Sequence, residues 1–120
     1  MKTQLVVIFT FLLAAVCCVQ PLKAQSKVET RFAVRGVCEM CKKRIENATD
    51  VKGVVFSEWN AEKQELFLVY KPKLITLETI HKRIQAVGHD TELGHASDSA
   101  YSKIHSCCRY RAEKESHISH

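Results

Sequence analysis

The feature that most constrains the fold is a pattern of strand, helix and strand that occurs twice in one stretch of the chain. Residues 28–34 alternate between apolar and polar side chains, which is typical of a strand with one buried face. Residues 41–49 then place apolar side chains at helical spacing, and residues 54–59 return to a strand pattern. A second unit follows. Its expected elements are a strand at residues 65–70, a helix at residues 77–88 and a short strand at residues 89–93.

This order predicts an α+β, ferredoxin-like βαββαβ sandwich, in which two helices cover a four-stranded antiparallel sheet. Thr76 is the expected N-cap of the second helix, and Gly88 ends that helix. His81 lies off the apolar stripe of the second helix, so we expect it at the surface. The predicted core consists of Phe32, Val34, Ile45, Val54, Phe56, Leu66, Leu68, Leu77, Ile80, Ile84 and Val87.

The first residues of the chain have the pattern of a secretory signal peptide rather than of a folded segment. Residues 1–24 begin with a positive charge, continue with an apolar run too short to span a bilayer, and end at the small residue Ala24. A lipoprotein anchored at Cys17 or Cys18 is the alternative. We therefore expect a periplasmic or otherwise exported monomer that has no membrane association after cleavage.

Length and charge limit the classes of function. Without Lys2 and Lys23, the net charge of +5 falls to about +3, which is too mild to indicate a nucleic-acid partner. The remaining chain is long enough for one small domain at residues 27–94 and a tail at residues 95–120. No catalytic constellation of side chains is evident, so we expect a protein that is not an enzyme.

Cys38 and Cys41 form a Cys-x-x-Cys motif on the loop that enters the first helix. The helix N-terminus and the cations that follow the motif favour thiolates, which are the metal-binding form of cysteine. Soft thiolates select Cu(I) and, by the same logic, Hg(II), whereas Zn(II) prefers four ligands. An exported protein also meets an oxidising compartment, so a thiol–disulfide redox protein that uses the same cysteines stays open.

The motif, its place at the first strand–helix junction and the sequence AVGHD at residues 86–90 resemble the heavy-metal-associated domain family. That family includes copper chaperones, metal-binding modules of copper-transporting P-type ATPases and a periplasmic mercury-binding protein. The resemblance covers residues 27–94. It implies Cys38 and Cys41 as the primary ligands of a metal ion, and a metal-transporting P-type ATPase or an efflux component as a partner.

The sequence departs from the family pattern in two places, within the metal loop and at His89. The family usually has Gly-Met-x-Cys-x-x-Cys, but only Val37 separates Gly36 from Cys38 here. We expect Val37 to fill the place of the methionine in the core, and Met40 to face solvent or pack rather than bind the ion. His89 follows the glycine that ends the second helix, where relatives often have tyrosine, phenylalanine or lysine. The family fold brings this loop beside the cysteines, so His89 is a candidate either as a third ligand or as a neighbour that supports the ligands.

The tail at residues 95–120 lies beyond the family domain and is expected to begin with a short helix capped at residues 97–98. His105, Cys107 and Cys108 make a candidate secondary ligand set, either as a second site or folded back on the first. Neighbouring cysteines are poorly suited to a mutual disulfide. The alternative is that the tail packs on the domain through apolar contacts and that its thiols pair with the first two cysteines in an oxidised form.

Overall fold

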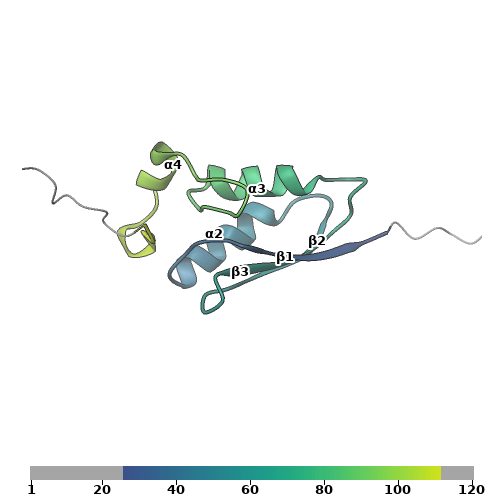
Figure 1. Ribbon diagram of the computed structural model, residues 1–120, viewed down its shortest axis with the longest axis horizontal. Helices are drawn as coiled ribbons and strands as arrows, with labels where there is room; N and C mark the ends of the chain where they lie inside the picture. The colour runs from purple at the N-terminus through teal and green to yellow at the C-terminus, as the bar shows by residue number, and fades with distance from the viewer. Residues whose placement is uncertain (1–25, 112–120) are drawn as a thin grey trace, which may run out of the picture.

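A computed structural model describes residues 26–111 as a body of strands and helices followed by a short tail (Figure 1). The body contains β1 (Val28–Ala33), α2 (Glu39–Thr49), β2 (Val54–Asn60), β3 (Glu65–Tyr70) and α3 (Leu77–Ala86). The tail contains α4 (Asp98–Ser102) and the 3-10 helix η2 (Ser106–Cys108). The predicted signal peptide lies outside the described residues. Within them, no helix is long and apolar enough to cross a membrane.

The three strands form an antiparallel sheet in the order β1-β3-β2, and α2 and α3 lie on one face of it (Figure 1). The central strand β3 directs Leu66 and Leu68 into the space below the helices, where both are fully buried. The hydroxyl of Thr76 accepts a hydrogen bond from the backbone N–H of Thr79 at 3.2 Å, as the predicted N-cap requires. The α+β class and the two helices are confirmed.

Seven of the eleven predicted core residues are buried, Val54 and Leu77 are partly buried against them, and Val87 is half-buried outside the main cluster. The clear error is on β2. A bulge between Val54 and Phe56 adds one residue to that strand, which moves the following side chains to the opposite face. Phe56 is therefore 46% exposed on the outer face of the sheet and contacts Phe67, and the prediction that Phe56 is buried is wrong. The same shift brings Trp59 fully into the core.

The fourth strand expected at residues 89–93 is not seen. This segment does run along β1, because the Arg35 N–H donates to the Asp90 carbonyl at 2.9 Å and the Glu92 N–H donates to the Ala33 carbonyl at 3.1 Å. The chain then reverses direction through residues 92–93, because the backbone of Thr91 closes a tight turn with that of Gly94. The pairing therefore ends after isolated bridges and no regular strand forms.

Two further expectations about exposure are wrong. His81 is buried: its ring packs 4.0 Å from that of Phe32, and its Nδ1 lies 2.7 Å from the Thr91 hydroxyl. The segment after α3 covers this part of the helix, which the periodicity of the helix alone does not reveal. Val37 is 50% exposed and does not fill the core, since the shortened loop carries it outward.

The tail packs against the end of α3 and supplies part of the core. Ile104 and Cys108 are buried, and Ser97 caps α4 by accepting a hydrogen bond from the Ala100 N–H. Gly88 allows this approach: its φ is +99°, and a Cβ at this position would lie only 2.6 Å from Ile104 Cγ2. The apolar packing of the tail, left open by the sequence, is therefore present.

Polar groups hold the last described residues of the tail. The Arg111 guanidinium donates to Asp90 Oδ1 at 2.8 Å, to the Ala96 carbonyl at 2.6 Å and to Asp98 Oδ1 at 3.0 Å. The Tyr110 hydroxyl donates to the Gly88 carbonyl at 2.7 Å and accepts from the Asp90 N–H at 2.8 Å. We call these contacts of Tyr110 and Arg111 the tail clasp.

Candidate metal centre

The loop between β1 and α2 holds the Cys-x-x-Cys motif in a fixed position. Cys38 is the N-cap of α2, and its carbonyl accepts from the Lys42 N–H at 3.0 Å, which closes the first helical turn. This turn brings the Cys38 and Cys41 Sγ atoms to 3.8 Å. Cys41 is buried at the end of the core, whereas Cys38 is half-buried. The Cys38 thiol is therefore accessible from solvent, whereas the Cys41 thiol is not.

The residues before the motif fix the path of this loop over Trp59. A Cβ on Gly36 would lie 2.8 Å from Trp59 Cζ2, so only glycine permits this approach. The Gly36 N–H donates to the Gln64 side chain at 2.9 Å, and the Trp59 indole N–H donates to the Val34 carbonyl at 2.9 Å. The loop therefore rests on the core and positions the cysteines without requiring a metal ion.

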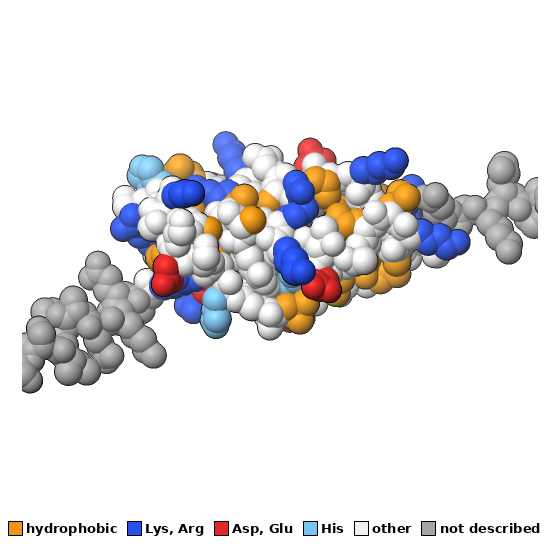
Figure 2. All heavy atoms as spheres, turned by 90° about the horizontal axis from the view of Figure 1, so that it is seen from above, with side chains coloured by type: hydrophobic (Ala, Val, Ile, Leu, Met, Phe, Trp, Pro, Cys, Tyr) orange, Lys and Arg blue, Asp and Glu red, His pale blue; other side chains and the backbone are white. Residues whose placement is uncertain are grey.

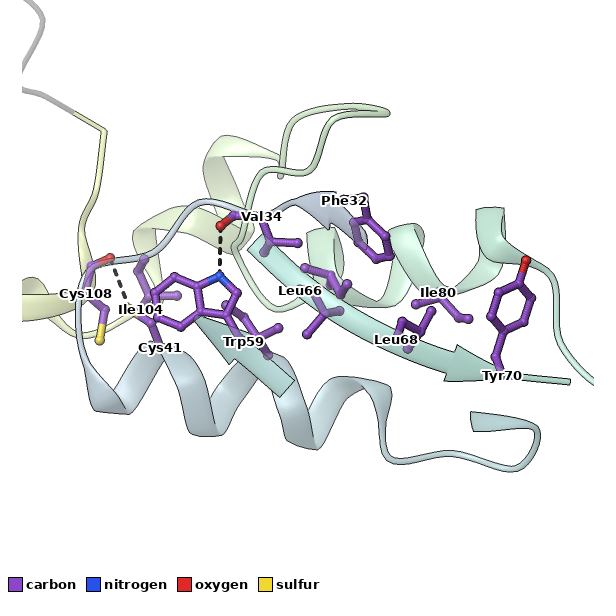
Figure 3. Close-up of a cluster of buried hydrophobic side chains, with 12 residues drawn as sticks. Phe32, Val34, Cys41, Trp59, Leu66, Leu68, Tyr70, Ile80, Ile104 and Cys108 are labelled. Carbon is purple, nitrogen blue, oxygen red and sulfur yellow. Dashed lines mark hydrogen bonds between the residues drawn. The ribbon is translucent and has the colours of Figure 1, made fainter. Parts of the chain in front are cut away.

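Cys108 from the tail joins the two loop cysteines. Its Sγ lies 3.2 Å from Cys38 Sγ, and the Cys41 thiol donates to its carbonyl at 3.7 Å. All three sulfurs lie within 4.8 Å of one another, and Figure 3 shows Cys41 and Cys108 together at one end of the core. We call Cys38, Cys41 and Cys108 the inner sulfur group.

The spacing of the inner sulfur group suits a single soft metal ion. With a metal–sulfur distance of about 2.3 Å, three sulfurs around one ion in a plane lie about 4 Å apart. The observed Cys38–Cys41 and Cys38–Cys108 separations of 3.8 and 3.2 Å need only small side-chain adjustments to reach that value. Thiol sulfur is a soft donor, so the chemistry of the set fits Cu(I) or Hg(II).

The three thiols differ in acidity. Burial raises the pKa of Cys38, but hydrogen bonds from the backbone N–H of Cys41, from the two neighbouring thiols and from the Met40 N–H outweigh it, and the pKa falls to about 7. Burial raises the pKa of Cys41 to about 11 and also raises that of Cys108. Cys38 is therefore the first thiolate, and an ion that binds all three must displace protons from the other two.

His89 does not belong to the inner sulfur group. Its Nδ1 lies 2.8 Å from the Arg35 carbonyl and must donate a proton there, and its Nε2 faces the Arg44 guanidinium at 3.4 Å, so that nitrogen must accept. The ring is buried and stacks on Tyr110, and burial lowers its pKa. His89 supports the metal loop through Arg35, and the structure does not bring it to the sulfurs.

His105 and Cys107 lie beside the inner sulfur group rather than in it. The Cys107 Sγ is exposed, 3.8 Å from Cys108 Sγ and 3.6 Å from Met40 Sδ. His105 Nδ1 lies 3.2 Å from Cys107 Sγ. The predicted tail set is thus divided, with Cys108 directed inward and the other two outward. We call Met40, His105 and Cys107 the outer group.

The basic residues after the motif do not form one patch. Lys42 binds Glu46 at 2.6 Å and the Trp59 carbonyl at 3.1 Å, so it is committed to the fold. Arg44 faces His89. Burial raises the pKa of Cys108, and the Arg44 side chain lowers it by a smaller amount. Figure 2 shows Lys and Arg side chains spread over the face that it presents. On that face, basic side chains are not gathered in a stripe that would suit a nucleic acid.

Sequence reasoning missed the tail clasp. Asp90, Tyr110 and Arg111 hold the tail against the body, yet no motif in the sequence indicates that Asp90 contacts the other two. The one available signal was an aromatic residue beside an arginine in an otherwise polar segment after the last cysteine.

No protein-family model matches the chain, and no curated protein matches it. Solved structures do match. The CopZ metallochaperone superposes with a TM-score of 0.52 at 23% identity, over 53% of this chain and 98% of that chain. A copper-binding domain from the P-type ATPase HMA7 superposes with a TM-score of 0.51 at 26% identity, over 53% of this chain and 89% of that domain. A third match is the N-terminal domain of a potential copper-translocating P-type ATPase from Bacillus subtilis in the Cu(I)-loaded state. Its TM-score is 0.54 at 22% identity, over 62% of this chain and 96% of that domain.

These neighbours are a metallochaperone and metal-binding domains, which are not enzymes. They match at most 62% of the 120 residues, or about 74, so none of them extends over all of residues 26–111. The body of this chain has the fold of the heavy-metal-associated domains, and its structural neighbours include a metallochaperone, a copper-binding domain and a Cu(I)-loaded domain of that fold.

Proposed function

We propose that this protein is an exported carrier that captures Cu(I) on Cys38, Cys41 and Cys108 and passes the ion to an acceptor. The observation that carries the proposal is the convergence of three thiol sulfurs within 4.8 Å of one another. The names of the structural neighbours, which include a copper-binding domain and a Cu(I)-loaded domain, support copper as the cargo. Hg(II) would be held by the same donors, whereas Zn(II) would lack a fourth ligand in this group.

The unequal exposure of the three cysteines suggests how the ion would move. Cys41 is buried and Cys38 is only half-buried, so an acceptor cannot reach the ion from the Cys41 side. Each bond from the ion to a new donor sulfur forms as a bond to one of the three cysteines breaks, and copper remains Cu(I) throughout. The acceptor, in this proposal, is the soft-metal domain of a transporting ATPase or an efflux component. The leader-like residues 1–24 support export.

The direct test is Cu(I) affinity, measured by competition with a chromophoric chelator under anaerobic, reducing conditions. Cys38→Ser with Cys41→Ser should lose tight binding and keep the circular dichroism of the wild type, because the apolar core holds the fold. Tight binding by that double variant would reject the proposal. Ser106→Ala, a change beside the cluster that removes no sulfur, is the matched control.

A thiol–disulfide function is the second candidate, and one contact favours it. Cys38 has a pKa of about 7, and its sulfur lies 3.2 Å from that of Cys108. Joining these two thiols would release two protons and two electrons to a disulfide substrate, whose sulfurs would be reduced to thiols. Reductase activity in metal-free protein, with no metal recovered after anaerobic purification, would favour this function over metal carriage.

A further inference from the structure

We propose that the outer group, Met40, His105 and Cys107, is a second soft-metal site through which ions enter and leave the inner sulfur group. This inference rests on the proposed function. Its basis is a convergence of three side chains from two elements. Met40 comes from the first turn of α2, and the other two come from the tail. Cys107 lies at the centre, 3.6 Å from the Met40 sulfur and 3.2 Å from the His105 ring nitrogen.

The outer group continues a line of sulfur atoms that begins in the core. From Cys41 the line runs to Cys38 at 3.8 Å, to Cys108 at 3.2 Å, to Cys107 at 3.8 Å and to Met40 at 3.6 Å. Every step is short enough for one ion to contact both sulfurs, because sulfurs that share an ion lie about 4 Å apart. An ion can therefore be held by the next donor before the previous one releases it.

The chemistry and the exposure of the outer group fit a transfer site rather than a storage site. Met40 is 46% exposed, and Cys107 and His105 are exposed. A thioether and an imidazole are neutral donors, so this group offers one thiolate where the inner group offers three. It should bind Cu(I) more weakly. A surface that places thioether and thiol sulfur together also selects soft ions over Mg²⁺ or Ca²⁺.

The entry step is a series of ligand exchanges. Cu(I) first binds Cys107 and Met40, and the thiol proton of Cys107 passes to solvent. A bond from the ion to Cys108 then forms as the bond to Met40 breaks, and the thiol proton of Cys108 also leaves. A bond to Cys38 then forms as the bond to Cys107 breaks, Cys107 regains a proton, the bond to Cys41 completes the inner site, and the protons that Cys38 and Cys41 carried pass to solvent. No electron is transferred, and release follows the same steps in reverse.

The first test counts Cu(I) ions bound by the reduced chain from residue 25 onward, by titration against a chromophoric chelator. Wild type should bind two ions, the second more weakly. Met40→Leu with Cys107→Ser should retain the tight ion, lose the weak one and exchange the tight ion several-fold more slowly. Ser106→Ala, in the same turn, should match wild type. A single ion in wild type, or a second ion retained by the double variant, would overturn the outer site.

The second test observes Met40 directly. It is the only methionine other than Met1, so replacing methionine by selenomethionine labels this position alone in the mature chain. X-ray absorption at the selenium edge should reveal copper next to selenium when two equivalents of Cu(I) are bound. Absence of such a neighbour would overturn the role of Met40. The failure of the proposed function is a separate result, since that requires tight binding to survive Cys38→Ser with Cys41→Ser.

Discussion

The body at residues 28–94 and the tail at residues 95–111 are held by different forces. Fully buried apolar side chains such as Leu68 and Ile80 hold the body. The tail adds a little apolar packing through Ile104, but its end depends on Arg111 and the buried carboxylate of Asp90. The inner sulfur group draws on both regions, so it is complete only when the tail is docked. Metal binding and tail docking should therefore strengthen each other.

The largest expected effect is the loss of a core side chain in the body. Leu68→Ala removes a fully buried side chain from the central strand and should lower the free energy of unfolding by about 3–4 kcal/mol. Leu93→Ala, at a position 61% exposed, should change it by less than about 0.5 kcal/mol. Urea unfolding followed by circular dichroism measures both. Equal effects would contradict the assignment of the core.

The next largest effect is the undocking of the tail from the body when Arg111 is removed. Arg111→Ala removes the partner of a buried carboxylate and should weaken tail docking by about 2–3 kcal/mol, while the body stays folded. Arg109→Ala is the matched control, since Arg109 is exposed and, among the residues that the structure describes, its side chain makes one long hydrogen bond, to the Ser102 carbonyl at 3.4 Å. Hydrogen exchange of the Ile104 and Cys108 amides should rise in the first variant alone. Unchanged exchange there would contradict the clasp.

Acid should affect the two regions in separate pH ranges. Burial raises the pKa of Asp90, but Arg111, the Ala96 N–H and His95 outweigh it and lower the pKa from 3.8 to about 2. The ionised Asp90 carboxylate contributes about 2 kcal/mol to tail docking above pH 4, and this contribution should be lost between pH 4 and pH 2.

In the body, burial lowers the pKa of His81 and His89 below 6.5. As the pH falls, these two histidines bind protons in the unfolded chain at a higher pH than in the folded protein. The stability of the body should therefore begin to fall below pH 6.5.

Hydrogen exchange measured at pH 7, 5 and 3 distinguishes these two ranges. Protection of β3 amides, corrected for the intrinsic pH dependence of exchange, should decline from pH 7 to 5, and that of tail amides should decline further at pH 3. A body equally stable at pH 7 and 5 would contradict the burial of neutral histidines.

The smallest expected effect concerns the exposed cysteine of the tail. Cys107→Ser should change the free energy of unfolding by less than about 0.5 kcal/mol, because the side chain is exposed and supports no packing. Cys108→Ser places a hydroxyl at a buried position and should cost about 1–3 kcal/mol. Thermal unfolding of both metal-free variants compares them. A greater cost at Cys107 would mean that the two tail cysteines have been assigned to the wrong groups.

Periodicity predicted the helices and β3 well, because these elements alternate or repeat without interruption. It failed where a single residue changes the register, as the bulge before Phe56 does, and where a distant segment covers a surface, as it does over His81. The loop cysteines were found because their spacing is local. The place of Cys108 depends on how the tail folds back, and the contact between Asp90 and Arg111 that decides this is not predicted by any local pattern.

The central claim is that the tail completes the metal site, and X-ray absorption at the copper edge tests it most directly. With one equivalent of Cu(I) bound, the wild type should have three sulfur neighbours around copper. Cys108→Ser should have two, and Cys107→Ser should retain three. Two sulfurs in the wild type, unchanged in Cys108→Ser, would contradict the claim and leave a site made by the loop cysteines alone.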